Sequence, residues 1–204
     1  MALGKLHERF IRSRRARILN KKLSGLLPDG ETSLLDIGCG DGTVAALLME
    51  SKPSVQVTGI DILVRHHTMI PVRPFDGRSI PFASGAFDFC MLVDVLHHSE
   101  DPLHLLKEAV RVSRNGVIIK DHLLQGIFAR NTLKFMDDTH NRRFGVSLPY
   151  HYWTPAEWES AFRVLGLKNA FYENRLQLYP AWADWIFGRK LHFLGLFLKP
   201  QNDR

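Results

Sequence analysis

Cysteine is scarce in this sequence, because its 204 residues include only two, Cys39 and Cys90. The two form no Cys-x-x-Cys pair and have no histidines at the spacing of metal ligands. We therefore expect no disulfide framework and no metal site. Both thiols are expected to be reduced and structural, as in a cytoplasmic protein.

Long apolar runs are also absent. No stretch reaches the roughly 18 apolar residues that a membrane-spanning helix needs. The start of the chain is basic and lacks the apolar segment of a secretory signal, so no such signal is expected. With 45% hydrophobic residues over 204 positions, the chain is long enough for one α/β domain with a sizeable core.

Acidic residues are almost missing from the first 24 positions, which hold eight Lys or Arg and only one acid, Glu8. Residues 3–24 also carry a ragged apolar stripe, which predicts a basic helix within an N-terminal arm of residues 1–27. Two interpretations stay open. The arm contacts an acidic partner, such as a membrane surface, a nucleic acid or a carrier protein, or it is a solvated helix that covers a ligand cleft.

Glycine, by contrast, is concentrated at one strand end. Residues 34–42 read as an apolar strand with the acid Asp36, followed by Gly38, Gly40 and Gly42 at alternate positions and an amphipathic segment. Glycine allows positive φ and lets a ligand approach the backbone. A helix that begins just after it presents free N–H groups and a positive dipole end. The pattern predicts a nucleotide-type cradle at the carboxyl end of a strand.

The details of this motif disfavour a dinucleotide. The dinucleotide fingerprint needs Gly or Ala where Thr43 stands. Asp36 would also repel a pyrophosphate, whereas a ligand with a cationic amine would suit it. Residues 36–42 (D-I-G-C-G-D-G) match every fixed position of D/E-x-G-x-G-x-G. That is the first motif of the class I S-adenosylmethionine (SAM)-dependent methyltransferases, and the chain resembles their type 11-like members.

Strands and helices alternate between residues 33 and 120, which predicts a doubly wound sheet. Strands are expected at residues 33–37, 55–61, 72–75, 87–93 and 117–120, and helices at residues 43–50 and after the N-cap Asp101. Pro71 and Pro74 leave too little room for a crossover helix, so residues 62–74 should form a short helix or an irregular loop. Asn115-Gly116 is expected to turn the chain into the fifth strand.

The C-terminal third is less regular. A helix is expected at residues 123–136, and a loop at residues 137–153 either closes as a lid over a small organic substrate or packs its aromatic residues on the sheet. Residues 154–157 form a capping box, and Gly166 closes the helix that follows. Two strands, at residues 168–172 or 175–178 and at 191–198, complete the sheet. For the aromatic segment 182–187, core burial is favoured over a membrane interface.

The family resemblance implies a Rossmann-like, doubly wound, seven-stranded, mostly parallel sheet with an antiparallel C-terminal strand and helices on both faces. It also implies contacts to SAM. The glycine turn would lie along the cofactor, Asp36 would support its amino-acid end, and Asp61 its ribose. Asp61 lies 19 residues past Gly42, near the usual spacing of a ribose-binding acid. The full set of implied contacts is Asp36, Gly38, Cys39, Gly40, Gly42, Asp61, Ile62, Asp76, Gly77, Asp94 and Val95.

A general base is optional for methyl transfer. Four histidines are candidates because imidazole titrates near neutral pH: His98, His122, His140 and His151. The His97-His98 pair is not expected to bind metal, because adjacent side chains should diverge and no carboxylate or cysteine stands at ligand spacing.

These observations predict one methyltransferase domain over residues 1–204. Its parts are the arm (1–27), a SAM-binding core (33–120), a substrate lid (121–153) and a C-terminal helix with antiparallel strands (154–200). The expected reaction is in-line transfer of a methyl group from SAM to a small-molecule or lipid-like acceptor, leaving S-adenosylhomocysteine; the enzyme holds donor and nucleophile at near-attack distance.

Two alternatives stay open: an RNA methyltransferase that uses the basic arm, and a non-catalytic partner subunit with a SAM-binding fold. Thr43 and Asp36 count against an NAD-dependent oxidoreductase. A DNA partner is not expected, because no D/N-P-P-Y/F sequence follows the fourth strand.

Overall fold

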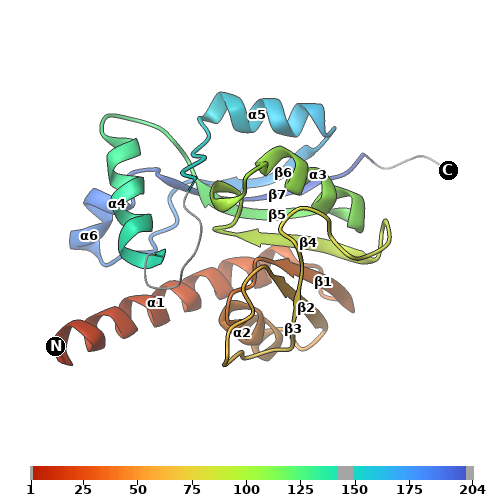
Figure 1. Cartoon of the computed structure of the whole chain (residues 1–204), viewed down its shortest axis with the longest axis horizontal. Coiled ribbons are helices and arrows are strands. Elements are labelled where there is room, and N and C mark those ends of the chain that lie inside the picture. Colours follow the sequence, from red (N-terminus) through yellow and green to blue (C-terminus); the bar gives the residue numbers. More distant parts are fainter. Residues whose placement is uncertain (1, 142–148, 201–204) are drawn as a thin grey trace.

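The computed structural model describes residues 2–141 and 149–200, without the side chains of residues 2–13, 140–141 and 181–182. These residues build one seven-stranded sheet in the order β3-β2-β1-β4-β5-β7-β6 (Figure 1). The strands are β1 (Thr32–Ile37), β2 (Val55–Asp61), β3 (Val72–Pro74), β4 (Phe87–Val93), β5 (Ser113–His122), β6 (Lys168–Glu173) and β7 (His192–Leu198).

The strand directions confirm the predicted fold class. Neighbouring strands from β3 to β5 run parallel, and β7 runs antiparallel to both β5 and β6. The strand order reverses between β1 and β4, where the chain returns from β3 to the other side of β1. In open α/β sheets, ligands bind beyond the carboxyl ends of the strands at such a reversal.

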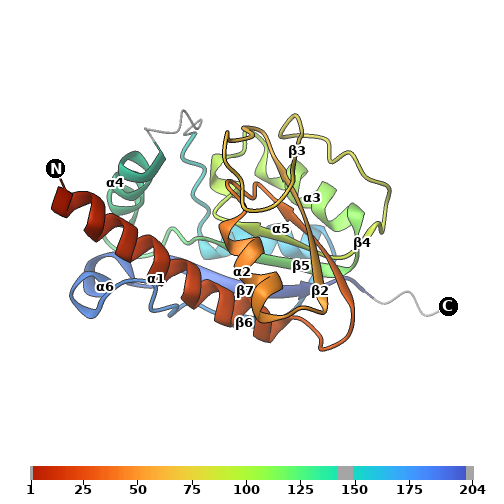
Figure 2. The ribbon, with the colours of Figure 1, turned by 90° about the horizontal axis from the view of Figure 1, so that it is seen from below.

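Helices cover both faces of the sheet. The helices α3 (Pro102–Val112) and α5 (Pro155–Val164) lie on one face, and α1 (Ala2–Leu26) and α2 (Thr43–Ser51) lie on the other, as Figure 2 shows from below. At one end of the molecule, α4 (Ala129–Asn141) and α6 (Ala181–Phe187) join the core on the side of α1. A short 3₁₀ turn, η1 (Leu96–His98), follows β4.

The central strands are apolar on both faces because both faces are covered. Successive side chains of a strand point to opposite sides. Leu35 and Leu92 therefore join the core beneath α3 and α5, while their neighbours Leu34 and Met91 join the core beneath α1 and α2. All four are fully buried. This double burial produces the uninterrupted apolar segment from which the fourth strand could be predicted.

Both helix starts that were predicted from capping residues are confirmed. The Asp101 carboxylate accepts a hydrogen bond from the backbone N–H of His104 at 3.0 Å, with Pro102 in the first helical position of α3. At α5, Thr154 and Glu157 form the full capping box. Side-chain caps satisfy N–H groups that the helix itself leaves unpaired.

Two boundaries differ from the prediction. Asn115 and Gly116 lie inside β5 and are not a turn; a Cβ on Gly116 would stand 2.2 Å from the carbonyl oxygen of Phe197, so the close approach of β7 requires glycine there. The helix expected at residues 123–136 is α4 and begins at Ala129. Gly126 and Phe128 have positive φ (92° and 61°), which stops a helix from starting earlier.

The connection between β2 and β3 contains no helix over the described residues 62–71, so of the two forms expected there, a short helix or an irregular loop, the structure has the loop. Ile70, 5% exposed, anchors it: a Cβ on Gly42 would lie 2.5 Å from Ile70 Cγ1, and one on Gly59 would lie 2.9 Å from its Cδ1. Gly42, with φ of 75°, thus makes room for this loop at the start of α2.

The second half of α1 is part of the fold. Leu19 and Leu23 are buried, and Lys22 Nζ lies 2.7 Å from both carboxylate oxygens of Glu173 on β6. At α6 the expectation of core burial is wrong for Trp185 and Ile186, which are 77% and 41% exposed. In the part of the chain that the structure describes, no helix is both long and apolar enough to cross a bilayer.

Candidate active site

A cavity of about 500 Å³ opens at the carboxyl ends of the parallel strands, within the size range of small-molecule sites. Seven predicted cofactor contacts line it: Gly38, Gly40, Asp61, Ile62, Gly77, Asp94 and Val95. Arg15 of α1 and Met136 and Asp137 of α4 close the other side. The structure thus gathers these residues from six separate stretches of the chain around one space.

Four predicted contacts do not line the cavity, each for a local reason. Asp36 is 3% exposed within β1, and burial together with Asp61 raises its pKa to about 8. The Cys39 sulfur packs against Gly59, and Gly42 faces Ile70. The Asp76 carboxylate is exposed and accepts hydrogen bonds from the backbone N–H groups of Arg78 and Ser79, which closes a turn.

The glycine turn lets neighbouring groups lie close to its backbone. Gly38 and Gly40 both have positive φ, and a Cβ on Gly38 would lie 2.6 Å from Val95 Cγ2. Asp61 Oδ2 accepts a hydrogen bond from Gly40 N at 2.7 Å, and its Oδ1 accepts one from Leu63 N at 2.8 Å. Asp61 therefore holds the turn against the end of β2, and its carboxylate keeps lone pairs that a ribose hydroxyl can use.

A buried ion group forms one wall of the cavity. The Asp94 carboxylate contacts the Arg15 guanidinium through one oxygen and the Lys120 ammonium through the other. Burial opposes the ionisation of Asp94, but the two cations outweigh it and hold its pKa well below the ordinary value. Burial, only partly offset by Asp94, lowers the pKa of Lys120 to about 8.

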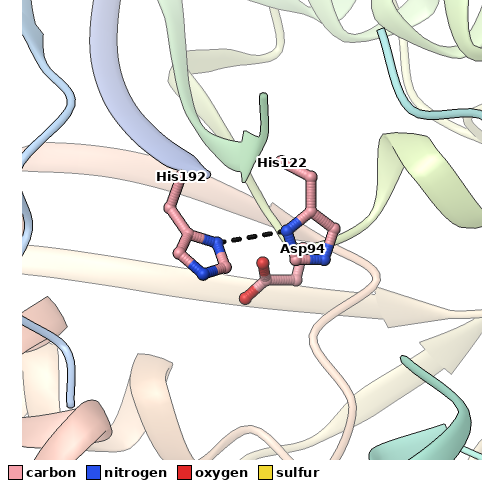
Figure 3. A group of neighbouring side chains, drawn as sticks. All are labelled: Asp94, His122 and His192. Carbon is pink, nitrogen blue, oxygen red and sulfur yellow. Dashed lines mark hydrogen bonds between the residues drawn. The ribbon is translucent and has the colours of Figure 1, made fainter. Parts of the chain in front are cut away.

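Two buried histidines, one from β5 and one from β7, lie next to this ion group. His122 and His192 stand beside Asp94, with their Nδ1 atoms 3.1 Å apart (Figure 3). His122 Nε2 lies 3.2 Å from Asp137 Oδ1. Burial, together with the neighbouring His97 or Lys120, lowers both imidazole pKa values well below the ordinary value, so both rings are neutral at pH 7.

His97 on η1 is held differently. Its Nδ1 lies 2.6 Å from Asp121 Oδ1, at the end of β5. Asp121 is itself fixed, because it accepts hydrogen bonds from the backbone N–H groups of His122 and Leu96. Although burial alone would lower it, Asp121 raises the pKa of His97.

The second ring nitrogen of His97, Nε2, is buried and unpaired among the described residues. His97 is 2% exposed and lines the cavity, and its Nε2 has no hydrogen-bond partner among the described residues. The nearest carboxylate oxygen, Asp137 Oδ1, is 3.7 Å away. A buried polar atom without a partner is costly unless a ligand completes it. The Asp121–His97 pair thus offers a proton acceptor to a molecule in the cavity.

The predicted base candidates differ in whether they line the cavity. His98 and His122 line the cavity, whereas His151 is exposed, with its Nδ1 2.8 Å from the carbonyl oxygen of Ser99. The side chain of His140 lies outside the described residues. His97 was not among the candidates. The polar run Lys120-Asp121-His122 at the end of an apolar strand was the available signal that a carboxylate stood within reach of η1.

Among the side chains that the structure describes, two groups come within metal-ligand reach: Asp94 with His122 and His192, and Asp137 with His97 and His98. The expectation that the adjacent His97 and His98 diverge is wrong, since η1 brings their ring centroids to 3.9 Å. In the first group, Arg15 and Lys120 already neutralise Asp94 and oppose a cation. In the second, Asp137 accepts a hydrogen bond from Tyr152 and lies beside His122.

Because both carboxylates are engaged within the chain, we expect the purified protein to carry no stoichiometric metal. Its unfolding midpoint should be the same with and without excess EDTA, measured by circular dichroism alongside elemental analysis of the protein. A midpoint that falls in EDTA and returns with Zn²⁺ or Mn²⁺ would instead assign a metal to one of these groups.

Comparison with known proteins fits this geometry. A methyltransferase domain family model matches residues 35–119. The 27-O-demethylrifamycin SV methyltransferase of Amycolatopsis mediterranei (strain S699) is 32% identical over 112 residues, which cover 48% of this chain and 41% of that protein. The chain thus spans about two fifths of the length of the curated relatives it matches.

Solved structures share the fold at low identity. An S-adenosylmethionine-dependent methyltransferase from Mesorhizobium loti aligns with a TM-score of 0.65 at 17% identity, over 88% of this chain and 96% of that one. A chain from the complex between the Haloferax volcanii Trm112 methyltransferase activator and a putative methyltransferase aligns with a TM-score of 0.63 at 16% identity, over 93% of each chain. Residues 35–119 thus match a methyltransferase domain, within a fold that the S-adenosylmethionine-dependent methyltransferase from Mesorhizobium loti shares.

Proposed function

We propose that this chain transfers a methyl group from SAM to a hydroxyl group of a small or lipid-like acceptor, with His97 as the general base. The observation that carries the proposal is the Asp121–His97 pair: His97 lines the cavity, and its buried Nε2 has no hydrogen-bond partner among the described residues. Methyl transfer to a neutral hydroxyl releases a proton, and this nitrogen is placed to take it.

The cavity suits SAM at both ends. Gly38 and Gly40 leave the backbone open where a side chain would intrude, and the Asp61 carboxylate faces the same space. Ile62, 56% exposed, presents an apolar surface on which a flat base can stack. When bound, SAM supplies an electrophilic methyl group on a sulfonium. Gly38, Gly40, Asp61 and Ile62 would hold it.

The acceptor chemistry follows from the fixed groups. As the acceptor oxygen formed its bond to the methyl carbon and the methyl–sulfur bond broke to leave S-adenosylhomocysteine, the hydroxyl proton would move to His97 Nε2. Asp121 accepts the Nδ1–H bond throughout and stabilises the imidazolium that forms. His97 then returns its proton to water as the products leave. The methyl group thus passes to the acceptor oxygen, and the proton passes through His97 to water together with the positive charge.

The alternatives have less support. Arg15 and Lys22 of the basic arm form ion pairs within the chain, so they are not free to bind RNA phosphates. A contact between the arm and an acidic partner would depend on residues 2–13, whose side chains are not described. A non-catalytic subunit would not require a carboxylate, Asp121, that orients a histidine of the cavity wall, His97.

Calorimetric titration with SAM, S-adenosylhomocysteine and NAD tests the cofactor first. We expect the wild-type chain to bind only the two SAM-type ligands, and Asp61→Ala to weaken this binding about 10- to 100-fold, the range for losing charged hydrogen bonds. Asp76→Ala is the matched control, because Asp76 is exposed outside the cavity and should leave affinity unchanged. Binding of NAD alone, or of none of the three, would refute the proposal.

A further inference from the structure

Five large apolar side chains are exposed around α4 and α6: Ile127 (79%), Phe128 (72%), Phe135 (58%), Trp185 (77%) and Ile186 (41%). We call them the outer patch. They come from two stretches of sequence that lie about 50 residues apart, yet Figure 1 places α4 and α6 together at one end of the molecule. Isolated exposed apolar residues are ordinary, but a set this large on adjacent helices marks an interaction surface.

Specific contacts join the two halves of the outer patch. The Phe135 and Phe187 rings stack with centroids 6.5 Å apart. Arg189 Nη2 donates a hydrogen bond to Thr132 Oγ1 at 3.2 Å, and Arg189 Nε donates one to the carbonyl oxygen of Ile186 at 3.0 Å. Thr132 in turn bonds to the carbonyl oxygen of Phe128. Phe128 and Ile186 are therefore held near each other by Arg189.

The exposed charged side chains around the outer patch are basic. Arg130, Lys134, Arg189 and Lys190 are all exposed. Within the described side chains of residues 124–135 and 183–190, no acidic side chain is exposed, since Asp184 is partly buried. A protein–protein interface is usually depleted of lysine, whereas aromatic residues flanked by lysine and arginine are typical of surfaces that bind anionic lipid.

The backbone conformation at Phe128 also favours an exposed side chain over a buried one. Phe128 has φ of 61°, a region that bulky residues seldom adopt, and it is 72% exposed there. On its other side, α4 sends Met136 and Asp137 to the active-site cavity. One short helix thus carries both the outer patch and part of the cavity wall.

We infer that the outer patch docks this protein on an anionic lipid bilayer. Trp185, Phe128 and Ile127 would enter the boundary between headgroups and acyl chains, and the four cations would lie at the level of the lipid phosphates. Docking of this kind would place the α4 side of the cavity near the membrane surface. The inference does not depend on methyl transfer, because lipid binding needs neither SAM nor turnover.

Flotation of the full-length chain with phosphatidylcholine vesicles, with and without phosphatidylglycerol, tests this inference. We expect binding to the anionic vesicles and little to the neutral ones. The double variant Phe128→Asn and Trp185→Ser should lower the partition coefficient at least about tenfold. Asparagine tolerates positive φ, so this change preserves the backbone. The pair Arg130→Gln and Lys190→Asn should lower it about fivefold per cation, at low salt only.

The matched control is Val164→Ser on α5, where the valine is 71% exposed away from the outer patch. It should bind vesicles as the wild type does. Circular dichroism verifies that every variant is folded. Absence of vesicle binding, or an equal loss in Val164→Ser, would overturn the inference. So would a wild-type dimer, seen by light scattering, that the Phe128 and Trp185 changes convert to a monomer, because the outer patch would then be a self-interface.

Discussion

Replacing His97 by alanine is expected to lower kcat by about 10²- to 10⁴-fold, the usual contribution of a positioned general base. The affinity for SAM should change little, because the residues proposed to hold SAM lie on other segments of the cavity wall. The assay measures S-adenosylhomocysteine formed with acceptor pools of small molecules and lipids, and calorimetry measures SAM binding separately. A drop in kcat without a loss of SAM binding would show that the variant is impaired in deprotonating the acceptor and not in binding the cofactor.

His151→Ala is the matched control for this experiment. His151 also lies near η1, where its backbone N–H donates to the carbonyl oxygen of His97, but its side chain is exposed and outside the cavity. We expect His151→Ala to retain wild-type kcat. If His97→Ala is as active as the wild type, His97 is not a general base. The rate would then depend only on how the protein positions SAM and the acceptor.

The pH profile separates Asp121 as a positioning residue from a merely structural one. His97 must be neutral to accept a proton, so kcat should rise with pH as the ring loses its proton. Because Asp121 raises the pKa of His97 over the opposing effect of burial, this rise should be centred above the ordinary histidine value of 6.5. In Asp121→Asn the pKa falls, and the rise should move to lower pH. An unchanged profile would contradict the pairing.

The sequence was informative where chemistry depends on neighbouring residues. The glycine turn, the apolar strands, the capping box and Asp61 are local patterns, and the structure contains each of them. Asp61 also lines the cavity, and its contact with a ribose stays a prediction. Each of these features depends on backbone conformation or on strand periodicity, which a few adjacent residues determine.

The base and its surroundings could not be predicted in the same way. His97 meets Asp121 only because β4 and β5 are parallel neighbours, and His122 meets His192 only because β7 inserts between β5 and β6. Asp137 reaches this cluster because α4 continues to Asn141, beyond the expected end at residue 136, which puts residue 137 on a helix and not in a loop. Such contacts depend on strand order and helix position, to which the spacing of residues along the chain gives no direct guide.

Replacing Asp94 by alanine is expected to lower the free energy of unfolding by about 3–5 kcal/mol, the usual cost of removing one partner from a buried ion pair. The reason is Lys120, whose side chain has no exposed surface. Without Asp94, its charge is left uncompensated beside Arg15. Chemical denaturation followed by circular dichroism measures the change. Asp29→Ala is the matched control, because Asp29 also pairs with a lysine but is fully exposed, and we expect no measurable loss there.

The pH dependence identifies Lys120 as the cause. Its folded pKa, about 8, is lower than its ordinary value of 10.5, so the unfolded chain binds more protons between these values and wild-type stability should rise with pH across that interval. Loss of Asp94 lowers the folded pKa further, so in Asp94→Ala the rise should begin below pH 8. Adding Lys120→Met should restore most of the lost stability and abolish this rise. If Asp94→Ala proves as stable as Asp29→Ala, then solvent, and not Asp94, compensates the Lys120 charge.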